Sequence, residues 1–280
     1  MTEFIYWWQN LPGNLSPVLF EIGPLSLRYY GLMYVVAFLI VYFLAMYRLN
    51  HEPHIPISKK QVGDLMTAMI LGLIIGARVG YVVFYNFSYY LYHPLEIILP
   101  FDFSNGIKFI GIAGMSYHGG LIGVVLAAMW YCRKAKVNFP EAADLIIPGG
   151  PLGYTFGRLG NFINNELYGR ITQSAIGMHF PSAPGKELRH PTQLYEAFFE
   201  GVFLFLILWF LRHAKLPKGA MIPIYLFGYG FVRFFIEFFR EPDAHLGFVF
   251  MWFTMGQVLC FAMISCGVAL FIYQIKYANS

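Results

Sequence analysis

The chain has 280 residues, of which 58% are hydrophobic and only 12% are charged. Soluble domains are about one-quarter charged, so this composition excludes an ordinary soluble protein and indicates a membrane protein. The formal net charge of +4 does not indicate a nucleic-acid-binding protein, because the basic residues lie in small groups beside apolar runs and form no stripe. Since apolar runs recur from residue 29 to residue 275, we expect residues 1–280 to form a single integral membrane domain.

Seven apolar runs are long enough to cross a membrane, which takes about 20 residues at about 1.5 Å each. The first is Tyr29–Tyr47, between Arg28 and Arg48. The others lie near residues 62–84, 110–131, 139–158, 191–211, 219–239 and 252–275. The predicted fold class is therefore an all-α polytopic membrane protein with about seven transmembrane helices. In the fourth run, the Pro- and Gly-rich stretch Ile147–Pro151 should break or kink the helix.

Basic residues between these runs predict the topology. One set of alternate loops carries most of them: Arg48, Lys59, Lys60, Arg133, Lys134, Lys136, Arg212, Lys215, Lys218 and the tail residue Lys276. By the positive-inside rule these loops are cytoplasmic, so the N-terminus is exoplasmic and the C-terminus is cytoplasmic. No cleavable signal is evident in residues 1–17, so the first span serves as its own insertion signal. Residues 85–109 and 159–190 mix aromatic, Pro and polar residues, which predicts an exoplasmic interfacial arm and a small exoplasmic head.

Ionisable residues within spans are energetically costly and favour a functional role. On the predicted topology seven of them fall in the exoplasmic half or at its surface: Arg78, His118, Arg158, Glu196, Glu200, Arg233 and Glu237. A shared polar cavity that opens outward would explain all seven. Structural alternatives remain open for some, because Glu200 or Arg240 taken singly could snorkel to the interface. Arg233 and Glu237 are four residues apart on one helix and could simply pair.

Two further patterns predict structure and not chemistry. Asp64 and Asp144 lie at cytoplasmic helix starts, where a carboxylate caps the N-terminus and complements the helix dipole. Glycines recur at Gly72, Gly76 and Gly80, and again at Gly119, Gly120 and Gly123. This small-residue spacing is typical of membrane helices that pack closely.

The most polar motif lies where the fourth span leaves the membrane, in the segment Gly157–Arg170 with the sequence GRLGNFINNELYGR. It resembles the signature of the bacterial prolipoprotein diacylglyceryl transferases, G-R-x-G-N-F-x-N-x-E-x-x-G, and every specified position is present. Family-like blocks follow the same order along nearly the whole chain: Tyr29–Tyr34, Gly114–Gly120, Arg189–Glu196, and Gly228–Gly230 leading to Arg233 and Glu237. Two departures are minor: Tyr29 stands where Trp is common, and Ala113 where a second Gly often occurs.

The resemblance implies an enzyme of the bacterial inner membrane that carries out the first step of lipoprotein maturation. The lipobox cysteine thiol of a prolipoprotein signal peptide would displace glycerol phosphate from phosphatidylglycerol and form a thioether. Family likeness assigns catalytic roles to His118, Arg158, Arg233 and Tyr30, and phosphatidylglycerol-binding roles to Arg158, Arg233, Asn161, Glu166, Tyr229, Glu237 and Glu196. Guanidinium groups suit this chemistry, because they can fork onto an anionic phosphodiester that gains charge as it leaves.

The identity of the base stays open at this point. His118 is the natural candidate to deprotonate the acceptor thiol, but a carboxylate or Tyr30 could do so while His118 orients the substrate. A histidine hydrogen-bonded in a helix interface is the bland alternative. No metal cluster or cofactor fingerprint appears in the sequence, and the three cysteines share no metal-ligand spacing, so we expect no cofactor. Interrupted helices and buried charges also occur in secondary transporters, and a non-catalytic assembly or receptor protein is a third possibility.

Overall fold

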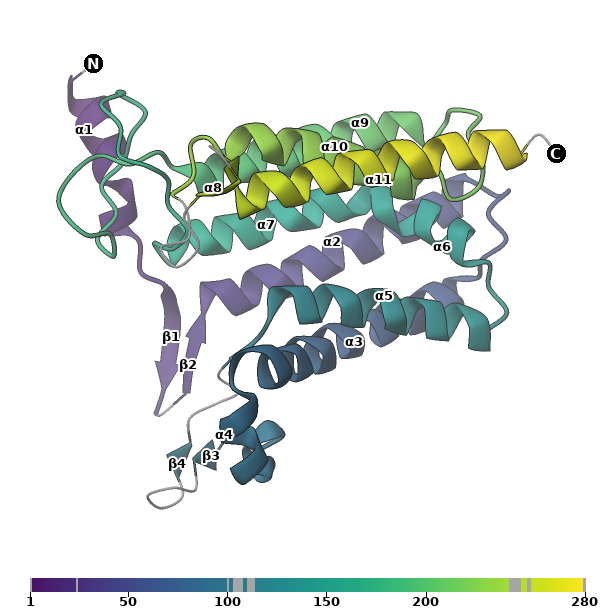
Figure 1. Ribbon diagram of the computed structural model, residues 1–280, viewed down its shortest axis with the longest axis horizontal. Helices are drawn as coiled ribbons and strands as arrows, with labels where there is room; N and C mark the ends of the chain where they lie inside the picture. The colour runs from purple at the N-terminus through teal and green to yellow at the C-terminus, as the bar shows by residue number, and fades with distance from the viewer. Residues whose placement is uncertain are drawn as a thin grey trace. The chain divides into compact units, whose positions relative to one another are not determined.

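The computed structural model describes residues 2–23, 25–99, 101–102, 108–109, 114–241, 248–250 and 253–278 (Figure 1). The chain divides into two compact units, which we describe separately. The first combines Met1–His51 with Ala143–Ser280, and the second is Glu52–Ala142.

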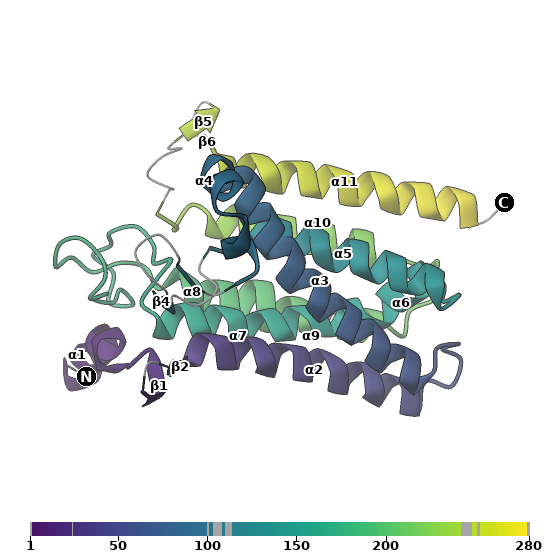
Figure 2. The ribbon, with the colours of Figure 1, turned by 90° about the horizontal axis from the view of Figure 1, so that it is seen from below.

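The first unit is a group of packed helices. Its N-terminal part consists of α1 (Thr2–Asn10), η1 (Leu11–Asn14), the hairpin β1 (Val18–Ile22) and β2 (Leu25–Arg28), and α2 (Tyr29–His51). Its later elements are η3 (Ile147–Gly149), α7 (Gly150–Ile163), α8 (Thr192–Tyr195), η4 (Glu196–Phe203), α9 (Leu204–Leu211), α10 (Met221–Ile236), the hairpin β5 (Phe248–Phe250) and β6 (Phe253–Thr254), and α11 (Met255–Ala278). Helix α2 packs along α7, α7 along η4, and α10 along α11. Figures 1 and 2 show α2 beside α7 and α10 beside α11.

The second unit is built on two long helices, α3 (Lys59–Tyr85) and α5 (Tyr117–Lys134). Between them lie α4 (Phe87–Tyr92), η2 (Pro94–Ile97) and the short strands β3 (Phe101–Asp102) and β4 (Lys108–Phe109), while α6 (Phe139–Ile146) spans the boundary with the first unit. The glycines of α3 and α5 face one another, because a Cβ added to Gly76 would overlap the Gly119 carbonyl and lie 2.7 Å from the Cα of Gly123. The predicted close packing at these glycines is therefore confirmed.

The helices agree with an all-α membrane protein. Four described helical segments are long and apolar enough to cross a membrane: Tyr29–His51, Lys59–Tyr85, Thr192–Leu211 and Met255–Lys276. The other three predicted runs overlap α5, the pair α6 and α7, and α10, and residues 110–113 of the run that meets α5 lie outside the described residues. Helix α7 has only 14 residues, because the 3-10 turn η3 interrupts the helical path at Ile147–Gly149. The predicted break at the Pro- and Gly-rich stretch is therefore confirmed.

Asp144 fixes the start of α10, the helix that carries Arg233. Its carboxylate accepts hydrogen bonds from the backbone N–H of Gly219 at 2.6 Å and of Met221 at 3.0 Å. The predicted capping role is confirmed, although Asp144 caps a helix other than the one to which it belongs. For Asp64 the prediction is wrong, because Ser58 caps α3 and the Asp64 carboxylate pairs with a lysine one turn earlier.

The end of α7 and the segment that follows it share a small hydrophobic core, formed by Phe162, Met178 and Phe180. Residues from the N-terminal region pack against this core, and Trp8 Nε1 donates a hydrogen bond of 3.1 Å to the Ile176 carbonyl. The segment is therefore ordered by contacts with residues near the start of the chain. The hydropathy of the sequence does not predict the contact between the N-terminal region and this segment, because the two are far apart in sequence.

Candidate active site

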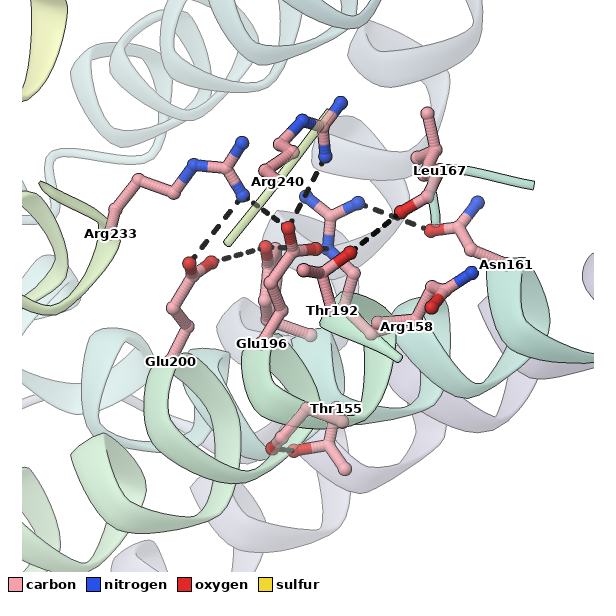
Figure 3. A network of polar contacts seen from close by, with 12 residues as sticks. Thr155, Arg158, Asn161, Leu167, Thr192, Glu196, Glu200, Arg233 and Arg240 are labelled. Atoms are coloured by element: carbon pink, nitrogen blue, oxygen red, sulfur yellow. Dashed lines mark hydrogen bonds and ion pairs between the residues drawn. The ribbon is translucent and has the colours of Figure 1, made fainter. Parts of the chain in front are cut away.

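The site is built where α7 and η4 approach each other. Segment η4 is π-helical, a conformation that is rare and often found at functional sites. Gly201 permits the approach, since an added Cβ there would overlap the hydroxyl of Thr155 and lie 3.0 Å from its Cβ. Thr155 also donates a hydrogen bond of 3.2 Å to the Ala197 carbonyl (Figure 3). One turn further along α7, Arg158 is therefore held beside Glu196.

Glu196 is the centre of a buried cluster of charges (Figure 3). Its fully buried carboxylate contacts three guanidinium groups: Arg158 Nε at 2.8 Å, Arg233 Nη1 at 2.5 Å and Arg240 Nη1 at 3.2 Å. Each of these arginine side chains is 13–15% exposed. Charges removed from water in this way require close opposite partners, so the three guanidiniums and Glu196 depend on one another for their positions.

Two more glutamates complete the cluster around Arg233. Nη2 of Arg233 lies 2.9 Å from Oε2 of Glu237, and Nη1 lies 3.6 Å from Oε1 of Glu200. Arg233 thus does pair with Glu237, but it also lies close to Glu196 and Glu200. The snorkelling alternative is wrong for Glu200, which is fully buried, and for Arg240, which pairs with Glu196.

Arg158 is also held from its own helix. Nε donates a hydrogen bond of 2.5 Å to the Tyr154 hydroxyl, and the guanidinium lies 4.8 Å from the centre of the Tyr154 ring. Nη1 donates to Oδ1 of Asn161 at 3.2 Å, and Asn161 Nδ2 donates to Oε1 of Glu166 at 2.7 Å. Asn161 therefore helps to fix Arg158, and Glu166 acts through Asn161.

Tyr154 links Arg158 to Arg233 by way of Glu200, and the sequence did not predict this role. Its hydroxyl donates to Oε2 of Glu200 at 2.5 Å, and its ring meets Tyr229 edge-on, with ring centres 5.9 Å apart. The spacing contained a signal for this residue, because Tyr154 precedes Arg158 by four positions and such residues share a helix face. Tyr229 therefore borders the cluster through Tyr154.

The signature segment that follows α7 is held in an unusual backbone conformation. Asn165 and Leu167 have φ angles of 56° and 61°, in the left-handed region that non-glycine residues seldom adopt. Neighbouring groups hold this turn: Thr192 Oγ1 donates to the Leu167 carbonyl at 3.0 Å, and Gln193 Nε2 donates to the Glu166 carbonyl at 2.6 Å. Such strain is often stored at functional sites.

Tyr30 lies in the first turn of α2, where that helix packs on α7. A Cβ added to Gly160 would lie 3.1 Å from the Tyr30 ring, so the two helices approach closely at this point. The Tyr30 hydroxyl is 3.1 Å from that of Tyr34. The structure thus places Tyr30 beside α7, against Gly160, which directly precedes Asn161.

His118 and Arg78 belong to the second unit, so their membership of a cavity shared with the arginine cluster stays a prediction. The exposed His118 side chain lies in the first turn of α5, whose N-cap is Ser116. Ser116 is fixed to α3 by a hydrogen bond of 2.9 Å from its backbone N–H to the Ala77 carbonyl. The exposure of His118 does not fit the alternative of a histidine hydrogen-bonded in a helix interface.

Arg78 holds backbone segments together within the second unit. Its Nε donates to the Ile97 carbonyl at 2.8 Å and Nη1 to the Gly114 carbonyl at 3.2 Å, while Nη2 donates to the Glu96 carbonyl. The guanidinium also lies 4.9 Å from the centre of the Tyr90 ring. Arg78 thereby links η2 to the segment that precedes α5 and His118.

The fold and the cluster define a multi-pass helical membrane protein with a buried group of arginines and glutamates beside a strained, polar signature segment. Residues 17–273 match the family model described as prolipoprotein diacylglyceryl transferase, and the chain belongs to this family.

Relatives named phosphatidylglycerol–prolipoprotein diacylglyceryl transferase are similar over nearly the whole chain. The protein from Chlorobaculum tepidum is 54% identical over 281 residues, covering 100% of this chain and 97% of its own length. That from Aliivibrio salmonicida is 46% identical, covering 95% and 90%. One from Francisella tularensis subsp. holarctica is 41% identical, covering 92% and 93%.

Proposed function

We propose that this protein transfers the diacylglyceryl group of phosphatidylglycerol to the lipobox cysteine of prolipoproteins. The observation that carries the proposal is the convergence of Arg158, from the family signature, and Arg233 on the carboxylate of Glu196. Membership of the transferase family and the names of its relatives support the same activity. The product would be a thioether, and glycerol phosphate would be released.

The arginine cluster suits the donor. In the proposed reaction the cysteine sulfur forms a bond to the glyceryl carbon that bears the phosphate, and the bond between that carbon and the phosphate oxygen breaks. The electron pair stays with the departing glycerol phosphate, whose negative charge increases. Guanidinium groups fixed in a site of low dielectric stabilise such charge without reorganisation. Arg158 and Arg233 are held in this way by Glu196.

The acceptor thiol must lose its proton. Its ordinary pKa is about 8.5, so a base that removes the proton raises the reactive thiolate fraction at neutral pH. We assign this role to His118, with Tyr30 as the alternative base. Asn161, Glu166, Tyr229, Glu237 and Glu196 are assigned to donor binding, and the reaction requires no metal or cofactor.

The activity can be tested with the purified full-length protein in detergent or in a lipid bilayer. Phosphatidylglycerol and a peptide carrying a lipobox cysteine should give a peptide whose mass has increased by one diacylglyceryl group, together with free glycerol phosphate. A peptide with serine in place of the cysteine is the control. A transporter or a non-catalytic assembly protein would bind or move these molecules without forming the thioether, and that result would refute the proposal.

We further propose that the protein lies in the bacterial inner membrane, with its N-terminus outside and its C-terminus in the cytoplasm. Residues 85–109 would be an interfacial arm and residues 159–190 an exoplasmic head. Exposed apolar side chains in the arm support this, among them Tyr92, Leu95 and Ile98. Aromatic and aliphatic groups of this kind are typical of the membrane–water interface.

Cysteine labelling should report this topology. In a variant with the three native cysteines replaced by alanine, Lys134→Cys should react with a membrane-impermeant maleimide only from the cytoplasmic side. Ser174→Cys should react only from outside, because basic loops stay in the cytoplasm. Labelling of intact spheroplasts and of inverted vesicles measures the two sides separately. The opposite pattern would place the signature segment on the wrong face for a secreted precursor.

The proposed base can be tested by the dependence of turnover on pH. If His118 deprotonates the acceptor thiol, His118→Gln should lower turnover by about 10²-fold at pH 7. The loss should shrink by about pH 9, because the thiol ionises spontaneously as the pH approaches its own pKa of about 8.5. The rates of the wild type and the variant are compared from pH 6 to pH 9 with saturating donor.

An orienting role predicts a different profile. Glutamine would then misplace the acceptor equally at every pH, so the ratio of the two rates would stay constant and would rule out His118 as the base. His93→Gln is the matched control, since His93 lies between α4 and η2 in the same unit and has no assigned role. Its profile should follow that of the wild type.

A further inference from the structure

Arg240 lies just beyond the end of α10, where the signature segment holds its backbone. Gly169 pairs with Arg240 in an antiparallel bridge, and Arg170 Nε donates to the Arg240 carbonyl at 2.9 Å. The backbone N–H of Arg170 also donates to the Phe239 carbonyl at 2.8 Å. These contacts come from a different part of the chain, so the position of Arg240 depends on the signature segment and on α10 together.

The Arg240 side chain turns back into the charged cluster. Nη1 lies 3.2 Å from Oε1 of Glu196, and the side chain is 14% exposed (Figure 3). Within the described part of the chain, Nε and Nη2 have no hydrogen bond or ion pair. Glu196 therefore anchors one edge of this guanidinium and leaves N–H groups on the other nitrogens available.

Arg233 differs from Arg240 in this respect. Its Nη1 lies 2.5 Å from Glu196 and 3.6 Å from Glu200, and its Nη2 lies 2.9 Å from Glu237. Three carboxylates thus surround both terminal nitrogens of Arg233. An anion that bound there would lie beside these carboxylates, whose negative charge would oppose it.

Arg158 resembles Arg240. Its Nε and Nη1 contact Glu196, Tyr154 and Asn161, whereas Nη2 has no hydrogen bond or ion pair among the residues that the structure describes. We infer that Arg240 is a further ligand of the donor's phosphate and binds it together with Arg158, in addition to the roles already assigned to Arg233. This inference rests on the proposed function. It assigns to Arg240 a place in the binding site that its sequence position alone did not indicate.

The test compares donor binding and turnover in the full-length protein. Arg240→Gln removes the positive charge and the planar fork but keeps a polar side chain. We expect the KM for phosphatidylglycerol to rise roughly 10- to 100-fold, the range for loss of a hydrogen bond to a charged group, with a smaller change in kcat. Retention of phosphatidylglycerol by the protein in detergent, measured by mass spectrometry, should fall in parallel. Arg240→Lys should give an intermediate KM, because one ammonium replaces charge but not the fork.

An unchanged KM would overturn the inference, whether kcat falls or not, because loss of a direct ligand of the phosphate must weaken donor binding. Arg212→Gln is the matched control: Arg212 stacks on Trp209 near the end of α9, and its variant should keep the wild-type KM. Thermal unfolding of each variant checks that it is folded. If Arg240→Gln is not folded, the KM of Arg240→Lys provides the test. Absence of thioether formation by the wild type would refute the proposed function instead, while the lipid-retention assay would still report on Arg240.

Discussion

Replacing Arg158 with alanine is expected to reduce diacylglyceryl transfer about 10³-fold without preventing membrane insertion. The substitution removes a guanidinium that contacts Tyr154, Asn161 and Glu196. Loss of a single preorganised donor typically costs about 10²- to 10³-fold in rate, and Arg158 supplies more than one. Turnover at saturating phosphatidylglycerol and peptide measures the effect. We expect Arg233→Ala to be equally damaging, since it also leaves Glu200 and Glu237 without their ion pairs.

Lysine should rescue poorly at both positions, for different reasons. At position 158 a single ammonium lacks the planar fork that engages two partners and the phosphate at once. At position 233 it would have to satisfy three surrounding carboxylates. Near-normal turnover of Arg158→Lys would contradict the fork argument at that position. Arg212→Ala, outside the cluster, should retain wild-type turnover.

Gly169→Ala should lower transfer by about 10²-fold and destabilise the protein by about 1–3 kcal/mol, the usual cost of forcing extra volume into a packed site. An added Cβ would overlap the Phe239 carbonyl, and it would lie 2.7 Å from Thr192 Cγ2 and 2.8 Å from His190 Cβ. Backbone is among these neighbours, so the bridge between Gly169 and Arg240 must move. Turnover and the thermal unfolding midpoint are the measurements.

Gly150→Ala is the matched control for Gly169→Ala. Gly150 begins α7 in the same unit, and a Cβ there would meet nothing within 4 Å. The control should keep both activity and stability, since alanine also favours helix. If Gly169→Ala behaved like this control, the close approach of the signature segment to the end of α10 would not be required for function.

Much of the fold could be predicted because the lipid bilayer restricts the sequences that can cross it. A spanning helix needs a long apolar run, and Tyr29–His51 and Met255–Lys276 satisfy this without any knowledge of their neighbours. The two glycine groups likewise predicted close helix packing, which the structure has between α3 and α5. The π-helical turn at Glu196–Phe203 could not be predicted, because the same apolar run is compatible with an ordinary α-helix and only packing against α7 distinguishes them.

The sequence could predict which charged residues in apolar surroundings lie together, and their catalytic and binding roles stay predictions. Arg158, Glu196, Arg233 and Glu237 were predicted to share a cavity, and they do form one cluster. The role of Tyr154 could not be inferred from its own position, since a tyrosine in an apolar run is unremarkable until its hydroxyl partner is known. Arg240 was ambiguous for a similar reason: it lies at a helix edge, where a charge can equally face water.

The π-helical turn also makes the helix register part of the site. Each residue of an α-helix advances about 100° around the axis, so loss of one residue between Glu196 and Leu211 would rotate the two ends of this helix against each other by about that angle. Either the glutamates would leave the arginines or the apolar face of α9 would leave its neighbours. A substitution along this helix changes one side chain and leaves the others in place. An insertion or deletion changes the helix length and separates the charged site from the packing that supports it.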